Sequence, residues 1–300
     1  MEDKLADVVD ILERSNVDYS VIYYPEKSKK SIDIVARDPS RKLVIKVSMD
    51  KVSKEEIVEL EKFAYLVNSF PVLVTDETEE DIAIQKDKVV GLSLEGFRKL
   101  IEGEKIFIYR TRGGIFVKIR SEVMKRKREK MSFSMGDLAK MLGVSRKTIY
   151  DYENGECDVS IEIAEKLVDI FGPEIIGDVF EDMNNRSRIE LEDEEKNQVS
   201  KILADEGFSI ATLKLTAVDV VASRGNEKVL IAIGPKRAEF ARRKAEEAKK
   251  LATKLNASLI TIVRTYNMVK ELEKDGFKAY MSDDLTSLRD EIKRDNRGKG

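Results

Sequence analysis

The spacing of hydrophobic residues predicts an α/β segment at the start of the chain. Over residues 5–12, apolar residues recur every three or four positions, as on one face of a helix. A second helix opens at Ser53 and buries Ile57, Leu60 and Phe63. Between and after these helices, short apolar stretches bounded by polar turns predict strands over Tyr19–Tyr24, Ser31–Ala36, Lys42–Val47 and Pro71–Val74.

The last third of the chain repeats this order of elements. A helix is predicted over Asn197–Asp205 and a long charged helix over Lys236–Leu255. Strands are predicted over Ser209–Leu215, Val218–Ala222, Val229–Ile233 and Ser258–Val263. Asp33, Ala36, Lys42 and Ile45 each find the same residue type 186 positions later. We interpret the two ends as homologous domains, although two unrelated α/β domains with similar hairpins would also produce some of these matches.

A different pattern fills the middle of the chain. The dipeptide Gly113-Gly114 separates two apolar runs, Lys105–Thr111 and Ile115–Arg120, which predicts a β-hairpin. The second run leads into Ser121, which is placed to cap a helix that continues through Lys130. The hairpin therefore connects the first α/β segment to a helical insert.

Two short helices in this insert are separated by a tight turn. Ser134 is placed to cap the first helix, with Asp137 at the third position of a capping box. Gly143 suits the turn, where a left-handed backbone is needed, and Ser145 is placed to cap the second helix. Ala139 must be small where the helices cross, and this spacing is typical of a helix-turn-helix.

These residues resemble the Cro/lambda-repressor helix-turn-helix family over roughly residues 121–171. The matching positions are Leu138, Ala139, Leu142, Gly143, Val144, Ser145, Ile149, Tyr152, Glu153, Asn154 and Gly155. Met135 departs from the pattern, because the family usually has a glutamine there that helps to fix a phosphate. The layout of the whole chain also looks like that of archaeal HTH-type transcriptional regulators.

The resemblance implies which residues contact DNA. The recognition helix would run from Arg146 to Asn154 in the major groove. Base edges would be contacted by Arg146, Lys147, Tyr150 and Asp151, and phosphates would be approached by Ser134, Ser145 and Thr148.

Local charge agrees with this interpretation. Between Lys118 and Tyr150 there are ten basic and three acidic residues, whereas the whole chain has a net charge of −3. A local basic patch is what phosphate binding requires. Alternatively, the basic run Lys125–Arg128 is only an ordinary solvated helix face, and the helix pair binds another protein.

The order of elements in the two end domains also resembles the restriction-endonuclease-like PD-(D/E)xK pattern. That chemistry needs two carboxylates on a divalent metal and a nearby lysine. Asp33 and Lys46 match, but Val44 stands where the second acid should be. Glu56 or Glu59 could supply a migrated carboxylate.

The second copy matches this pattern less well. Asp219 is followed by Leu230-Ile231-Ala232, which lacks both the acid and the lysine. We therefore expect Asp33 and Asp219 to close turns or cap strands in domains without catalysis.

Composition excludes several other kinds of site. The chain of 300 residues has no histidine and one cysteine, Cys157, which excludes imidazole catalysis, histidine-bound zinc and an intramolecular disulfide framework. The single cysteine makes a reducing cytoplasm the expected compartment. No apolar run approaches the length of a membrane span, and no signal peptide is evident at residues 1–4. Charged residues make up 37%, with the two signs nearly balanced, as in a thermophile surface of ion pairs.

The sequence thus predicts a cytoplasmic, sequence-specific regulator that binds double-stranded DNA, without enzyme activity, cofactor or metal. A homodimer is expected because a single recognition helix gives little specificity. The alternatives are a structure-specific, metal-dependent nuclease and an adaptor for transcription or repair proteins. The fold class is α/β plus all-α, with two homologous nuclease-like domains around a helix-turn-helix. Its segments are an α/β domain (1–104), a hairpin connector (105–120), a helix-turn-helix domain (121–183), an acidic linker (184–197) and a second α/β domain (198–300).

Overall fold

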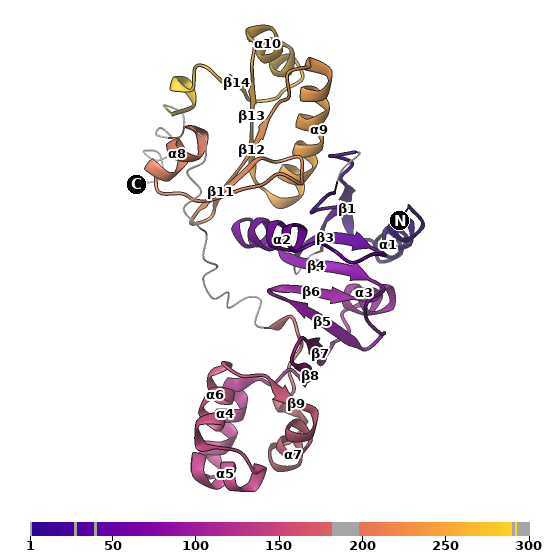
Figure 1. Ribbon diagram of the computed structural model, residues 1–300, viewed down its shortest axis with the longest axis vertical. Coiled ribbons are helices and arrows are strands. Elements are labelled where there is room, and N and C mark those ends of the chain that lie inside the picture. Colours follow the sequence, from indigo (N-terminus) through magenta and orange to yellow (C-terminus); the bar gives the residue numbers. More distant parts are fainter. Residues whose placement is uncertain (1, 27–28, 39–40, 182–197, 290–291, 293–300) are drawn as a thin grey trace. The chain divides into compact units, whose positions relative to one another are not determined.

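The computed structural model describes residues 2–26, 29–38, 41–181, 198–289 and 292. It forms two compact units (Figure 1). Unit 1 joins the two ends of the chain, residues 1–73 and 186–300, and unit 2 comprises residues 74–185. The five segments expected from the sequence remain a prediction about how the chain divides, and the expected linker at 184–197 lies outside the described residues.

The first half of unit 1 follows the predicted order of elements. These are α1 (Glu2–Arg14), β1 (Asp18–Val21), β2 (Ile34–Arg37), β3 (Lys42–Ser48), α2 (Lys54–Leu66) and β4 (Phe70–Thr75). The strands β1, β2 and β3 are antiparallel neighbours, and β4 follows β3 in the order of the sheet. Ser53 begins α2 through a capping box with Glu56, so the helix starts where the sequence predicts.

The second half of unit 1 has its own five-stranded sheet. Its elements are α8 (Gln198–Asp205), β10 (Ser209–Thr212), β11 (Val220–Arg224), β12 (Glu227–Ile233), α9 (Ala238–Leu255), β13 (Ser258–Val263), α10 (Tyr266–Lys274) and β14 (Ala279–Met281). The sheet runs in this same strand order, with β12, β13 and β14 parallel. The last helix and strand, α10 and β14, are additions that the sequence analysis did not predict.

The two halves share one strand register. Ile34 of β2 faces Ile45 of β3, and Val220 of β11 faces Ile231 of β12, so each residue pairs as its counterpart 186 positions away does. A slip of one residue would turn every side chain to the other face of the sheet. The shared register therefore supports the homology that the sequence indicates.

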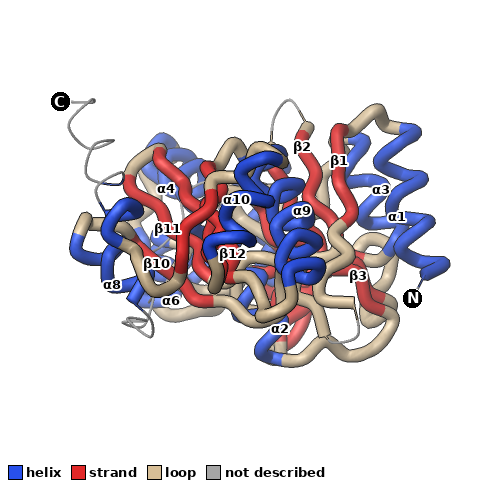
Figure 2. The backbone as a smooth tube through the Cα atoms, turned by 90° about the horizontal axis from the view of Figure 1, so that it is seen from above, coloured by secondary structure: helices blue, strands red, loops and turns tan. Residues whose placement is uncertain are grey.

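The halves also pack against each other reciprocally. Helix α9 of the second half contacts β1 and β2 of the first, and α2 of the first half contacts β10 and β11 of the second. Figure 2 shows α9 beside β1 and β2. Equivalent elements meet as they do across the two-fold axis of a homodimer. Unit 1 is therefore arranged as a pseudo-two-fold pair within one chain.

A pair of glutamates marks this pseudo-symmetry. Glu59 of α2 accepts hydrogen bonds from the backbone N–H groups of Lys214 and Leu215, at 2.6 and 3.0 Å. Glu247 of α9 accepts one from the N–H of Tyr23, at 2.7 Å. Tyr23 and Lys214 each lie two residues beyond the equivalent strands β1 and β10. The two helices thus bind the opposite half in the same way.

Unit 2 combines a small sheet with the helical insert. Its elements are β5 (Ile82–Lys86), β6 (Val89–Leu92), α3 (Leu94–Glu102), β7 (Ile108–Thr111), β8 (Gly114–Val117), α4 (Ser121–Lys130), α5 (Met135–Leu142), α6 (Arg146–Asn154), β9 (Val159–Ser160) and α7 (Ile161–Phe171). Its strands have the order β6-β5-β7-β8-β9.

The predicted hairpin packs into the same hydrophobic core as the helices of the insert. Val117 and Ile119, at the end of β8 and just after it, belong to the same core as Met124, Leu138 and Leu167. The hairpin also pairs with β9, which the sequence analysis did not predict because two residues carry no readable alternation. The hairpin is therefore part of the sheet of unit 2.

Candidate functional site

The helix-turn-helix of unit 2 forms as the sequence predicts. The hydroxyl of Ser134 accepts from the N–H of Asp137 at 3.1 Å, and that of Ser145 accepts from the N–H of Thr148 at 3.0 Å. Gly143 has φ 72°, the left-handed conformation that lets α5 turn sharply into α6. These contacts fix the start of both helices.

The predicted base-contacting side chains lie together on α6. Arg146, Lys147 and Tyr150 are exposed, with Tyr150 51% accessible, and Asp151 is half-buried. Ile149 and Tyr152 are buried on the opposite side of the helix. The exposed residues are thus free to face a ligand, while their neighbours hold the helix in the core.

The predicted phosphate-contacting residues have a structural task as well. The Ser134 hydroxyl donates to the Asp137 carboxylate at 2.6 Å, and this bond lowers the pKa of Asp137. The hydroxyls of Ser145 and Thr148 lie 2.8 Å apart and bond to each other. A phosphate at these positions would therefore meet groups that already hold the helix ends.

One residue of the basic patch anchors α6. Arg128 of α4 is buried and pairs with Glu153 of α6, with 2.9 Å between Nη2 and Oε2. Its Nη1 also donates to the carbonyl of Phe133 at 2.9 Å. The bond to Glu153 raises the pKa of Arg128 above its ordinary value. A buried charged pair of this kind fixes the position of α6 relative to α4.

The sequence analysis counted Arg128 as part of the basic surface. Arg120 and Lys127 are also engaged within the unit, with Glu181 and Glu174. Other cations of the patch have no carboxylate partner among the described residues. They are Lys125, Arg126, Lys130, Arg146 and Lys147, whereas the charge of Lys140 interacts with the carboxylate of Asp137. The charge available to a ligand is thus smaller than the sequence count and lies mainly on α4 and the start of α6.

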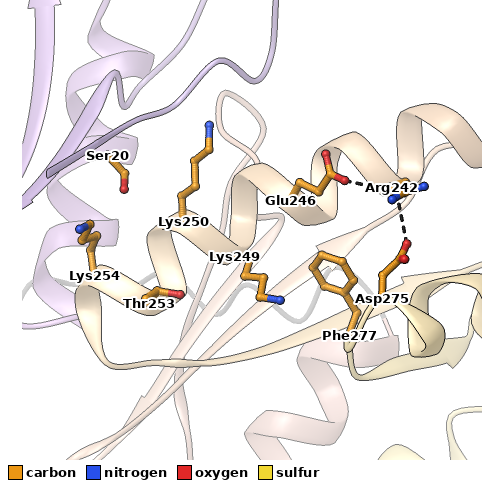
Figure 3. A pocket seen from close by; sticks show the side chains of 9 residues that line it. All are labelled: Ser20, Arg242, Glu246, Lys249, Lys250, Thr253, Lys254, Asp275 and Phe277. Carbon is orange, nitrogen blue, oxygen red and sulfur yellow. Dashed lines mark hydrogen bonds and ion pairs between the residues drawn. The ribbon is translucent and has the colours of Figure 1, made fainter.

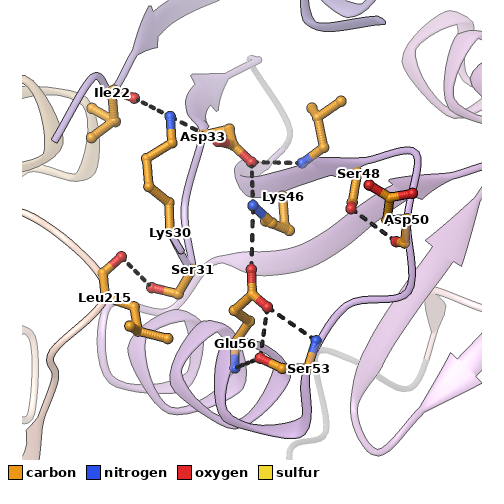
Figure 4. Close-up of polar contacts among 11 residues, drawn as sticks. Ile22, Lys30, Ser31, Asp33, Lys46, Ser48, Asp50, Ser53, Glu56 and Leu215 are labelled. Carbon is orange, nitrogen blue, oxygen red and sulfur yellow. Dashed lines mark hydrogen bonds and ion pairs between the residues drawn. The ribbon is translucent and has the colours of Figure 1, made fainter. Parts of the chain in front are cut away.

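The first half of unit 1 brings together the nuclease-like residues (Figure 4). Asp33 pairs with Lys46 at 3.1 Å and with Lys30 at 2.9 Å, and Lys46 lies 3.6 Å from Glu56. Asp33 also accepts from the N–H of Val47 at 2.9 Å. Glu56 thus stands where a migrated carboxylate could stand, but Lys46 already contacts both acids.

The second half has a different arrangement at the same place. Asp219 accepts from the N–H of Ile233 at 2.6 Å, as Asp33 does from Val47. Its cation is Lys244 of α9, at 2.6 Å, and Lys244 also lies 5.4 Å from the ring centroid of Tyr24. Burial raises the pKa of Asp219, and Lys244 opposes that shift. Both aspartates therefore cap strands, as the sequence predicts.

No metal site stands out in the described part of the chain. The described residues contain no group of three acidic or cysteine side chains placed to hold a metal ion. Glu59, the other candidate for a migrated carboxylate, is instead engaged with the backbone of residues 214 and 215.

A groove of about 520 Å³ lies along α9 in unit 1 (Figure 3). Four of its lining residues are basic, but three of them are neutralised: Arg242 by Glu246 and Asp275, Lys250 by Glu247, and Lys254 by Asp18. Lys249 lies 4.8 Å from the ring centroid of Phe277. The groove is therefore a network of ion pairs rather than a basic pocket.

Comparisons with known proteins agree with both kinds of module. A model of a PD-(D/E)XK superfamily domain matches residues 1–106 and 192–277, and a helix-turn-helix model matches residues 124–174. No solved structure matches the chain.

Curated relatives cover nearly the whole chain. A "putative HTH-type transcriptional regulatory protein" of Saccharolobus solfataricus is 47% identical over 100% of both chains. One from Saccharolobus islandicus strain M.14.25 is also 47% identical, over 97% of this chain and 96% of its own, and one from Sulfurisphaera tokodaii is 38% identical over 93% and 96%. These relatives confirm the resemblance to archaeal regulators. Within the described residues, no helix has the length and apolar character needed to cross a membrane.

Proposed function

Since the chain belongs to the family of archaeal HTH-type transcriptional regulatory proteins, with PD-(D/E)XK superfamily sequence at both ends, we propose that it binds double-stranded DNA sequence-specifically through α6. The observation that carries this proposal is that Arg126, Arg146 and Lys147 are exposed and form no ion pair with a described carboxylate, next to an α6 that Ser145 caps. Arg146 and Lys147 would donate to guanine in the major groove, and Asp151 would accept from cytosine. Ser134, Ser145, Thr148 and Tyr150 complete the proposed contact surface.

Two further features belong to the proposal. The protein would act as a homodimer in the cytoplasm, because two recognition helices reading a two-fold site supply the specificity that one helix lacks. The operator would then contain two inverted half-sites about one helical turn apart. Selection of bound duplexes from a random library tests this directly. Selected sites without inverted repeats would contradict the homodimer.

The role of α6 is tested with Arg146→Ala on the selected duplex. We expect binding to weaken by about 1–3 kcal/mol and selectivity to relax at one base pair. Lys166→Ala on α7, which removes an exposed cation paired with Glu162, is the matched control and should bind like the wild type. Unchanged affinity and selectivity of Arg146→Ala would reject α6 as the recognition helix. Absence of any salt-dependent DNA affinity in the wild type would favour the adaptor function instead.

A nuclease is the second candidate function, and the approach of Glu56 to Asp33 and Lys46 is the observation that favours it. Against it, a divalent ion would have to displace Lys46 from between the two carboxylates. Incubation of the protein with plasmid and linear DNA in Mg²⁺ or Mn²⁺ decides the matter. Cleavage that Asp33→Asn abolishes and Asp219→Asn leaves intact would establish a nuclease, and no cleavage would support the regulator.

A further inference from the structure

The two halves of unit 1 differ in charge at one equivalent edge. In each half, the chain leaves a central strand, enters a long helix and returns along the next strand. These strands are β3 and β4 in the first half and β12 and β13 in the second. The loops that follow them are therefore counterparts, and their side chains can be compared position by position.

The loops that follow β3 and β4 carry more acidic than basic residues. Asp50 and Lys51 follow β3 and balance each other. The segment that follows β4, at the start of unit 2, is Asp76-Glu77-Thr78-Glu79-Glu80-Asp81, which has five carboxylates in six residues. Lys86 pairs with Glu77, and Lys99 pairs with Glu80 and Asp81, so part of this negative charge is compensated.

The loops of the second half are basic. Lys236 and Arg237 follow β12, and Arg264 follows β13. All three side chains are exposed, and none forms an ion pair with a carboxylate among the described residues. This distinguishes them from the cations of the α9 groove, where Arg242, Lys250 and Lys254 are neutralised.

Both loops also lead to exposed aromatic rings. Phe240, at the start of α9, is 44% accessible and lies 6.0 Å from the guanidinium of Arg237. Tyr266, at the start of α10, is 60% accessible and lies 4.6 Å from the ammonium of Lys270. Exposed rings beside unpaired cations are the combination with which proteins hold nucleic-acid strands.

Parallel strands β12 and β13 end at this same edge, so their loops are neighbours. Gly234 confirms how close they are, because its N–H donates to the carbonyl of Ile262 at 2.7 Å. Among the described residues of these two loops and of the first turns of α9 and α10, Glu239 is the one acidic residue. Asp283 and Asp284 follow β14, where they bond to Ser282 and to the N–H of Thr286 and bound the surface on that side.

We propose that this edge, formed by Lys236, Arg237, Arg264, Phe240 and Tyr266, is a second DNA-contact surface that holds the phosphodiester backbone without reading sequence. Cations at this edge attract phosphates, and the equivalent loops after β3 and β4 present no such group of unpaired cations. The second half keeps Asp219 but has Leu230 where a nuclease would have its second acid, and it presents a basic edge. Its contribution is separate from that of α6, because it lies in unit 1 and requires no base contact.

The test measures binding of DNA of arbitrary sequence to the full chain. A labelled 24-base-pair duplex and a 24-base single strand are titrated by fluorescence anisotropy at several salt concentrations. The variant carries Lys236→Gln, Arg237→Gln and Arg264→Gln, and its control carries Lys29→Gln, Lys51→Gln and Lys54→Gln. Both variants lose three exposed positive charges from unit 1, so they have the same net charge.

We expect the variant to bind at least one form of DNA about tenfold more weakly and to lower the slope of log K against log salt by about 2–3, whereas the control stays close to the wild type. A conservative variant with Lys236→Arg and Arg264→Lys should keep wild-type affinity, and circular dichroism confirms that each variant is folded. If only the single strand responds, Phe240→Leu and Tyr266→Leu should reduce its binding through loss of stacking. Equal losses in variant and control, or no loss in either, would overturn the proposal. An Arg146→Ala background separates this outcome from any failure of α6.

Discussion

The two halves of unit 1 bury a lysine against equivalent aspartates, but they take it from different elements. In the first half, Lys46 of strand β3 meets Asp33, and Glu56 of helix α2 approaches the same lysine. In the second half, Ala232 occupies the strand position, and Lys244 of helix α9 reaches Asp219. Duplicated domains can therefore keep one interaction while the residue that supplies it moves from strand to helix.

The comparison also shows which part of the site resists change. Both aspartates accept from a backbone N–H fourteen residues later, that of Val47 or Ile233. This bond joins the start of one strand to the end of the next and needs only the shared register. The aspartate thus has a structural reason to persist in both halves, whatever chemistry surrounds it.

The largest effect expected from breaking this comparison comes from Lys46→Met. It leaves Asp33 and Glu56 buried with less compensation, since the side chains of Lys46 and Asp33 are only 7% and 5% exposed. Removing one partner of a buried ion pair costs about 3–5 kcal/mol. Denaturant unfolding should show a loss of this size, and a loss below 1 kcal/mol would mean that the pair is not buried in solution.

Lys244→Met should lower the free energy of unfolding by less, about 2–3 kcal/mol, because it leaves one carboxylate without its cation instead of two. That carboxylate, on Asp219, is also 28% exposed, so water replaces part of the lost interaction. The same denaturant titration ranks the two variants. A larger loss for Lys244→Met than for Lys46→Met would contradict the expectation that Lys46 contributes more to stability than Lys244.

A double variant rebuilds the second arrangement inside the first half. Lys46→Ala alone removes the cation, whereas Lys46→Ala with Glu56→Lys places a lysine on the helix, as Ala232 and Lys244 do. We expect the second change to restore about 1–2 kcal/mol of the loss, so the two substitutions are strongly non-additive. Glu56→Lys in the wild-type background should instead destabilise, because it sets two lysines side by side. Additive losses would show that the halves are not interchangeable.

The repeat and the helix-turn-helix could be predicted from the sequence, because both depend on short-range signals. The repeated strand pattern identifies Asp219 as the counterpart of Asp33. Ser134, Gly143 and Ser145 determine where the neighbouring helices begin and end. The fold class that follows from them is confirmed by the structure and by the matching family models. Local chemistry was therefore sufficient for the positions of the motifs.

Contacts between helices and distant strands could not be predicted in this way. The sequence does not show which face of α2 packs against β3. Glu56 and Glu59 are therefore equal candidates for a migrated carboxylate, and in the structure only Glu56 approaches Lys46. The role of Arg128 was missed for the same reason, since Glu153 is 25 residues away on another helix. A charged residue next to other charges looks exposed until the packing of its helix is known.

A loss of stability is also expected where Glu59 and Glu247 join the two halves of unit 1, the pseudo-two-fold seam. Glu59→Gln leaves one oxygen to accept two backbone N–H groups, and its amide group would face the other N–H. Hydrogen bonds to charged groups contribute about 1.5–3 kcal/mol, so we expect a loss within that range. Glu247→Gln should cost less, because Glu247 accepts from one backbone N–H, that of Tyr23, and its ion pair with the partly exposed Lys250 contributes little. Thermal unfolding measures both losses. Equal losses would show that the two glutamates contribute equally to stability although they accept different numbers of backbone hydrogen bonds.

The smallest expected effect is a change of stability with pH at the same seam. Burial raises the pKa of Glu59 above its ordinary value of 4.5, against the lowering effect of the N–H groups of Lys214 and Leu215. Between the ordinary and the raised value, the folded protein holds a proton that the unfolded chain has released, so the contribution of Glu59 to stability falls as pH rises through that window. Glu59→Gln cannot titrate, and the difference in unfolding free energy between wild type and variant should therefore grow on acidification from neutral pH towards 4.5. A difference that shrinks over this range would show that the N–H groups outweigh burial and that the carboxylate is favoured as the charged form.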